Sequence, residues 1–124
     1  MKAYITCPAT KMRERHDLLP VIEDVVRNNG VEPFVFEISS EPKEIFERDK
    51  KNLETSTHLI AEVSEASHGV GAEIGIAHML GLKIILLLEK GAVLSRFIRG
   101  VPGVKIIEYS DIDELKTKLN SVLS

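Results

Sequence analysis

The sequence alternates five times between a short apolar run and a longer segment with helical periodicity. The most apolar run, at residues 83–88, reads KIILLL and has no polar position after its lysine. A continuous run of this length is typical of a strand that is buried on both faces of a parallel sheet. No linker, low-complexity segment or internal repeat interrupts the alternation. The pattern therefore places the chain in the α/β class, in which helices connect parallel strands.

The expected elements define one doubly wound sheet. Five βα units with right-handed crossovers predict a flavodoxin-like or Rossmann-like five-stranded parallel sheet with the strand order 2-1-3-4-5. We expect strands at residues 2–7, 33–38, 58–63, 83–88 and 104–109, and helices at residues 11–29, 42–55, 69–80, 93–99 and 111–123.

Three helix starts carry recognisable signals. Pro20 falls inside the first expected helix, so either the helix is kinked there or its regular part begins near Asp17 with Pro20 in the first turn. The segment 39–42 (SSEP) is expected to cap the second helix. Asp111, followed three residues later by Glu114, has the spacing of a capping box for the last helix.

Length and composition indicate one ordinary globular domain, residues 1–124, with a net charge of −3. The lone Cys7 cannot form an internal disulfide, and the four histidines lack the spacing of metal ligands, so we expect no metal and a reducing cytoplasmic location. No apolar run is long enough to cross a membrane, and the acidic balance argues against nucleic-acid polymers as partners. The expected partner is therefore a small molecule.

Two loops are expected to form the ligand site. In a doubly wound sheet, ligands bind beyond the carboxyl ends of the strands where the strand order reverses, which selects the loops at residues 8–13 and 64–73. In the second loop, Gly69 and Gly71 let backbone N–H groups at a helix start bind an anion such as a phosphate, and Ser67 adds a hydroxyl. The spacing matches neither the dinucleotide fingerprint nor the Walker A pattern. The alternative is that the glycines only permit tight packing of the helix on the sheet.

Glu73 is the only acidic residue at the start of that helix, and we expect it in the first turn. There the macrodipole favours the ionised carboxylate, which suits a nucleophile better than a general acid. Tyr4, on the first strand, could reach across the switch point to orient Glu73. The alternatives are an acid that merely stabilises the helix and a strand aromatic with its tip at the surface. From periodicity alone, Asp49 is typical of a salt-bridging helix residue.

Five segments in order resemble the nucleoside 2-deoxyribosyltransferase superfamily, and most closely its 2'-deoxynucleoside 5'-phosphate N-hydrolases. These segments are YITCP at 4–8, IFERD at 45–49, LIAEV at 59–63, SHGVGAEIG at 67–75 and VLSRFIRG at 93–100. Because they span nearly the whole chain in matching order, the resemblance is more specific than any single motif.

The resemblance implies an N-glycosidase that hydrolyses deoxynucleoside 5'-monophosphates without a cofactor. Glu73 would be the nucleophile that forms a glycosyl-enzyme intermediate, and Tyr4 would orient it. Asp49 would hold the sugar or help to protonate the departing base. Ser67 and the Gly69 amide would bind the 5'-phosphate, and Ser95 would reach that phosphate from a neighbouring subunit of a homodimer.

One loop departs from the hydrolase pattern. Where the hydrolases carry a serine and then an arginine after the first strand, this chain has Pro8 and Thr10, with Lys11 and Arg13 as candidate substitutes in phosphate binding. Pro8 resembles the transferase branch. The sequence therefore leaves three alternatives to deoxynucleotide hydrolysis: base exchange between nucleosides, hydrolysis of a ribonucleotide, and a nucleotide-binding module without catalysis.

Overall fold

The five predicted strands form one parallel sheet with the order β2-β1-β3-β4-β5 in the computed structural model, which describes residues 1–8, 16–37 and 41–124. The predicted fold class and strand order are therefore confirmed. The chain order reverses between β1 and β3, which lie side by side with Tyr4 opposite Leu59. The strands are β1 (Lys2–Thr6), β2 (Glu32–Val35), β3 (His58–Glu62), β4 (Lys83–Glu89) and β5 (Lys105–Tyr109).

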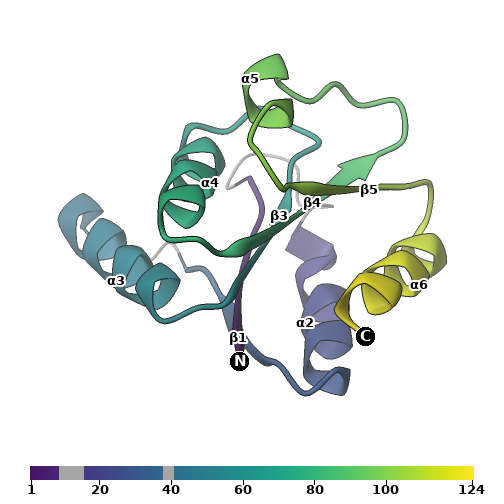
Figure 1. The fold of residues 1–124 in the computed structure, drawn as a ribbon, viewed down its shortest axis with the longest axis horizontal. Coiled ribbons are helices and arrows are strands. Elements are labelled where there is room, and N and C mark those ends of the chain that lie inside the picture. Colours follow the sequence, from purple (N-terminus) through teal and green to yellow (C-terminus); the bar gives the residue numbers. More distant parts are fainter. Residues whose placement is uncertain (9–15, 38–40) are drawn as a thin grey trace.

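Helices cover both faces of the sheet (Figure 1). On one face lie α2 (Leu19–Asn28) and α6 (Ile112–Leu123), and on the other lie α3 (Pro42–Glu54) and α4 (His68–Met79). The short α5 (Arg96–Arg99) follows β4. Within the described ranges, no helix has the length and apolar composition needed to cross a bilayer.

Three helix starts differ from the expectation, either in their first residue or in their cap. α2 begins at Leu19 with Pro20 in its first turn, which confirms the second alternative for this helix, while residues 11–15 lie outside the described residues. The N-cap of α3 is Glu41, whose side chain makes no capping hydrogen bond; Ser39 and Ser40 also lie outside the described residues. α5 begins at residue 96 rather than 93 because Ser95 caps it, its Oγ accepting a hydrogen bond from the backbone N–H of Ile98.

The capping signal of the last helix is confirmed. Asp111 Oδ1 accepts a hydrogen bond from the backbone N–H of Glu114 at 2.8 Å, and Glu114 Oε1 accepts one from the backbone N–H of Ser110 at 2.6 Å. The reciprocal bond therefore reaches one residue before the N-cap, a variant of the expected capping box.

Strand periodicity divides the core into two parts and positions the site. Ala3 and Ile5 of β1 belong to the core between the sheet and α2 and α6, whereas Tyr4 belongs to the core on the side of α3 and α4. Successive side chains of a strand alternate between faces, so Thr6 lies on the same face as Tyr4. Two hydroxyl groups of β1 are thereby directed toward α4 near the switch point of the sheet.

Candidate active site

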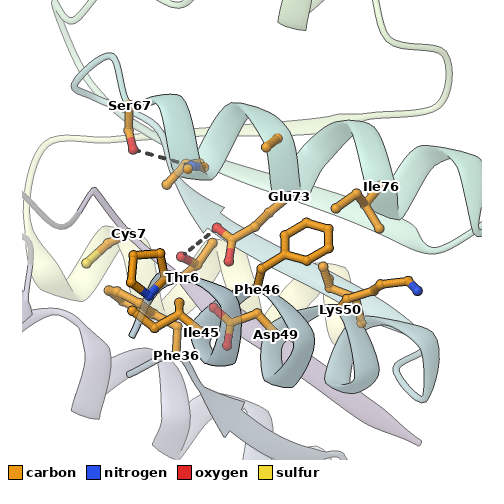
Figure 2. A pocket seen from close by; sticks show the side chains of 15 residues that line it. Thr6, Cys7, Phe36, Ile45, Phe46, Asp49, Lys50, Ser67, Glu73 and Ile76 are labelled. Atoms are coloured by element: carbon orange, nitrogen blue, oxygen red, sulfur yellow. Dashed lines mark hydrogen bonds between the residues drawn. The ribbon is translucent and has the colours of Figure 1, made fainter. Parts of the chain in front are cut away.

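The Glu73 carboxylate is held by two hydroxyl groups from β1. The Tyr4 hydroxyl donates a hydrogen bond to Glu73 Oε2. Thr6 Oγ1 donates one to Glu73 Oε1 at 3.0 Å (Figure 2). Tyr4 is fully buried and Thr6 is 1% exposed, so water does not compete freely for either donor. The contact expected between Tyr4 and Glu73 is present, and the alternative of a strand aromatic with its tip at the surface is wrong.

Glu73 lies in the second turn of α4, not in the first turn as expected. α4 begins at His68, and its first turn contains no acidic residue. Burial raises the pKa of Glu73 from 4.5 to about 7; the nearby Asp49 charge also raises it, while the hydrogen bonds from Tyr4 and Thr6 oppose the rise. The macrodipole acts mainly within the first turn, so burial rather than the helix end determines the ionisation of this carboxylate.

Asp49 approaches the same space from α3. Figure 2 shows the Asp49 and Glu73 side chains on facing helices, with the Asp49 carboxylate directed toward the cavity. The Asp49 side chain is 14% exposed, and Arg48 Nε lies 3.1 Å from its Oδ1, so the salt bridge expected from periodicity is present. Asp49 is also close enough to Tyr4 to raise the pKa of that hydroxyl, together with burial and Glu73. The structure therefore brings all three predicted catalytic residues together.

A cavity of about 390 Å³ opens beside the two carboxylates. Its wall has few polar side chains and many aromatic and aliphatic ones. Such a wall suits a flat ring that also carries a few polar groups. The polar contributors are Thr6, Asp49, Lys50, Ser67 and Glu73, and the apolar ones include Phe36, Ile45, Phe46, Leu53, Val70 and Ile76.

Ser67 and Gly69 lie at the α4 end of this cavity. Ser67 is the N-cap of α4, and its Oγ accepts a hydrogen bond from the backbone N–H of Val70 at 3.3 Å. Among the residues that the structure describes, none has an atom within 4 Å of a Cβ added at Gly69, Gly71 or Gly75. Tight packing against the described residues therefore does not explain these glycines.

Gly71 and Ser95 lie outside the cavity that contains Glu73. They line a neighbouring cavity of about 310 Å³, which is formed between the start of α4 and the segment before α5. Ser67 lines both cavities, so within one chain Gly71 and Ser95 lie beside Ser67 but apart from Glu73. Thr10, Lys11 and Arg13 lie outside the described residues.

Thr6 was not among the predicted site residues. It could have been predicted, because the period of two along a strand places residues 4 and 6 on one face. A similar signal marks Asp49, which lies four residues after Ile45 and four before the buried Leu53, in the apolar stripe of α3. A carboxylate at such a position is expected to face the sheet rather than solvent.

The arrangement suits attack by a carboxylate on an electrophilic carbon. One carboxylate is oriented by two donors that stabilise its ionised form, a second carboxylate lies across the cavity, and the apolar wall can accept a heterocyclic ring. In residues 1–8, 16–37 and 41–124, no three histidine, cysteine or acidic side chains come together in a way that could hold a metal ion.

Solved structures with this fold define the class. A CMP N-glycosidase from Clostridium botulinum superimposes with a TM-score of 0.82 at 25% identity, covering 98% of this chain and 99% of that one. A 2-deoxyribosyltransferase from Bacillus psychrosaccharolyticus shares the fold at a TM-score of 0.70 and 16% identity, covering 96% of each chain. The class is that of N-glycosidases and 2-deoxyribosyltransferases built on a doubly wound sheet.

Sequence relatives narrow the class to one family. A Thermofilum pendens protein, named provisionally as a 2'-deoxynucleoside 5'-phosphate N-hydrolase, is 35% identical over 99% of this chain and 95% of its own length. A 5-hydroxymethyl-dUMP N-hydrolase from Mus musculus is 33% identical over 81% of this chain and 60% of its own length. No protein-family profile matches the chain. The chain belongs to the 2'-deoxynucleoside 5'-phosphate N-hydrolase family, which confirms the resemblance and the prediction of an N-glycosidase.

The raised pKa of Glu73 predicts a pH-dependent stability. Between pH 4.5 and about 7 the folded chain holds a proton on Glu73 that the unfolded chain has released, so the free energy of unfolding falls as the pH rises. The difference between the pKa of Glu73 in the unfolded and the folded chain corresponds to roughly 3 kcal/mol in the free energy of unfolding. Glu73→Gln, which carries no charge, should be more stable than the native chain by up to that amount above about pH 8, and the gap should close toward pH 4.5.

Urea unfolding of the native chain and of Glu73→Gln across this pH range measures the difference between their free energies of unfolding. Tyr4→Phe serves as the matched variant, because it removes a hydrogen bond that lowers the pKa of Glu73 and should extend the fall in stability to higher pH. A constant gap between Glu73→Gln and the native chain at every pH would show that Glu73 ionises as readily in the folded state as in the unfolded one.

Proposed function

We propose that this protein hydrolyses the N-glycosidic bond of 2'-deoxynucleoside 5'-monophosphates and releases the free base and deoxyribose 5-phosphate. The observation that carries the proposal is the Glu73 carboxylate, held by Tyr4 and Thr6 and facing Asp49 in a largely apolar cavity. Membership of the N-hydrolase family supports the substrate class, because the Thermofilum pendens relative carries that substrate in its name.

In the first step, Glu73 attacks the anomeric carbon of the sugar. A bond forms between a carboxylate oxygen and that carbon, the bond from carbon to base nitrogen breaks, and the base leaves with the electron pair and takes up a proton. Deoxyribose lacks the 2-hydroxyl that withdraws electrons from an oxocarbenium-like transition state, so modest assistance from a carboxylate suffices. Asp49 holds the sugar or helps to protonate the base.

In the second step, water attacks the same carbon and displaces Glu73. The bond between carbon and carboxylate breaks, and the proton lost by water leaves with a nearby base. Two inversions at one carbon give net retention of configuration. A binder without catalysis would not need the oriented carboxylate pair, so the site favours an enzyme over a nucleotide-binding module.

The 5'-phosphate would bind where α4 begins. Gly69 has open space beside its backbone among the described residues, and Ser67 lines the same end of the cavity. Free backbone N–H groups at a helix start attract anions. The proposal also assigns Thr10, Lys11 and Arg13 to the phosphate, on the sequence alone, because they lie outside the described residues. Gly71, which lines the neighbouring cavity, is assigned to the same phosphate.

Ser95 would complete the phosphate site of a second subunit in a homodimer. It is exposed and lies between Val93 and Phe97, whose side chains are 89% and 85% exposed. Large exposed apolar side chains of this kind support a contact with a second copy of the chain. The chain has one cysteine and therefore no internal disulfide, which supports a reducing cytoplasm as the site of action.

Base exchange is the second candidate. Pro8 matches the transferase branch of the superfamily, and a 2-deoxyribosyltransferase shares the fold. A base instead of water would then resolve the glycosyl-enzyme intermediate. Ribonucleotides should also be tested as substrates, since the structural neighbour from Clostridium botulinum is named as a CMP N-glycosidase.

The first test of the activity is chromatographic detection of free base. The panel contains deoxynucleoside 5'-monophosphates, the matching ribonucleotides and unphosphorylated deoxynucleosides, each with and without a second base. We expect release from the deoxynucleotides alone, without need for an acceptor, and its loss in Glu73→Ala while the fold is kept. Nucleoside turnover only with a second base would identify a transferase, and no release from any compound would favour a binding module.

Ser95→Ala tests the phosphate contact across the dimer. We expect weaker binding of phosphorylated substrates, by about 2- to 10-fold for one lost hydrogen bond, with no change for nucleosides. Sedimentation of the same variant should still give a dimer, because the hydroxyl is small beside the apolar contact. Equal effects on both substrate types would remove Ser95 from the phosphate site, and a native monomer would contradict the homodimer.

A further inference from the structure

A second buried glutamate lies on the opposite face of the sheet from Glu73. Glu62, the last residue of β3, is fully buried, although a carboxylate is costly to remove from water unless it is hydrogen-bonded. Its Oε1 accepts a hydrogen bond from the backbone N–H of Ser64 at 2.6 Å, and its Oε2 accepts one from Ser64 Oγ at 2.8 Å. The Tyr109 hydroxyl donates to the same Oε2. These three residues are called the Glu62 cluster below.

The Glu62 cluster joins three strands to the loop that leads into α4. Ser64 Oγ accepts a hydrogen bond from the backbone N–H of Glu89 at 2.8 Å, at the end of β4, while Tyr109 ends β5. Ser64 is thus fixed to the ends of β3, β4 and β5 through one carboxylate and one hydroxyl. Only two residues separate it from Ser67, which caps α4 and lines the Glu73 cavity.

The two ends of the cavity are therefore held by hydrogen bonds from different elements. Glu73 is held from β1 by Tyr4 and Thr6, on the face toward α3 and α4. The start of α4 is held through Ser64 by groups on the other side of the sheet, where Tyr109 belongs to the core under α2 and α6. Because Ser67 precedes the helix and lies three positions after Ser64, a change in the Glu62 cluster should displace Ser67 more than the Glu73 carboxylate, which Tyr4 and Thr6 hold.

We infer that Glu62 is a positioning residue that fixes the phosphate-binding end of the site through Ser64, with Tyr109 orienting its carboxylate. The inference rests on the proposed function, because it assigns the start of α4 to the 5'-phosphate. Glu62 therefore affects how tightly the phosphorylated sugar binds, and the bond-breaking step at Glu73 does not depend on Glu62.

The test uses two mild variants, because Glu62→Ala removes a buried carboxylate from three donors and risks unfolding the chain. Ser64→Ala removes the hydroxyl that links Glu62 to Glu89, and Tyr109→Phe removes the donor from β5. The control is Ile107→Ala, two residues before Tyr109 and in the same core, which opens a cavity and destabilises the fold without removing a hydrogen bond of the cluster.

Calorimetric titration with deoxyribose 5-phosphate, which the enzyme does not consume, gives the dissociation constant of each variant. We expect an increase of about fivefold in Ser64→Ala and in Tyr109→Phe, in the range of one lost hydrogen bond, and no change in Ile107→Ala. For a deoxynucleotide that the native enzyme hydrolyses, KM should rise with the dissociation constant while kcat stays within about twofold.

Three outcomes would overturn the inference: an unchanged dissociation constant in both variants, an equal rise in Ile107→Ala, or a fall in kcat at constant KM. A native chain that binds deoxyribose 5-phosphate, shows the expected pattern across variants and releases no base would support the role of Glu62. That same result would contradict the proposed hydrolysis, so failure of one claim is distinguishable from failure of the other.

Discussion

The hydrogen bonds from Tyr4 and Thr6 to Glu73 connect the central part of the sheet to the helix that forms the site. They exist because β1 pairs with both β2 and β3, so its side chains are buried on each face of the sheet. The face toward α4 then receives two hydroxyl groups, spaced by the strand period of two. Glu73 is held in one orientation only while β1 keeps this register.

Opposing effects set the ionisation of Glu73. Burial and the charge of Asp49 raise its pKa, whereas the two hydroxyl donors lower it, and the balance lies at about 7. A carboxylate with a pKa near the working pH is available as a nucleophile in a large share of molecules. Partial burial also strips it of water, and the hydroxyl donors replace that water with fixed dipoles. Stability is given up for this arrangement, because the folded state is least favoured where Glu73 is ionised.

Most of the fold and part of the site could be predicted from the sequence. The alternation of apolar runs with helical segments predicted the sheet and its order, and it also located the two loops at the switch point. The first-turn position expected for Glu73 was wrong, because Glu73 is the sixth residue of α4, and burial outweighs the expected macrodipole effect. The period of two groups Thr6 with Tyr4, and the apolar stripe of α3 includes Asp49, but neither pattern specifies that these two faces meet at Glu73. The separation of Gly71 and Ser95 from the Glu73 cavity likewise follows from the turn into α4 and the short α5, whose geometry comes from capping rather than periodicity.

The central claim is that Glu73 forms a covalent bond to the sugar, and the stereochemistry of methanolysis tests it most directly. When a deoxynucleoside 5'-monophosphate is turned over in aqueous methanol, methanol competes with water for the sugar, and the resulting methyl glycoside keeps its anomeric configuration for analysis by NMR. Attack on a Glu73 ester requires the β-methyl glycoside, with the configuration of the substrate retained. A product of α configuration would show a single displacement by solvent, in which Glu73 serves only as a base and no glycosyl-enzyme forms.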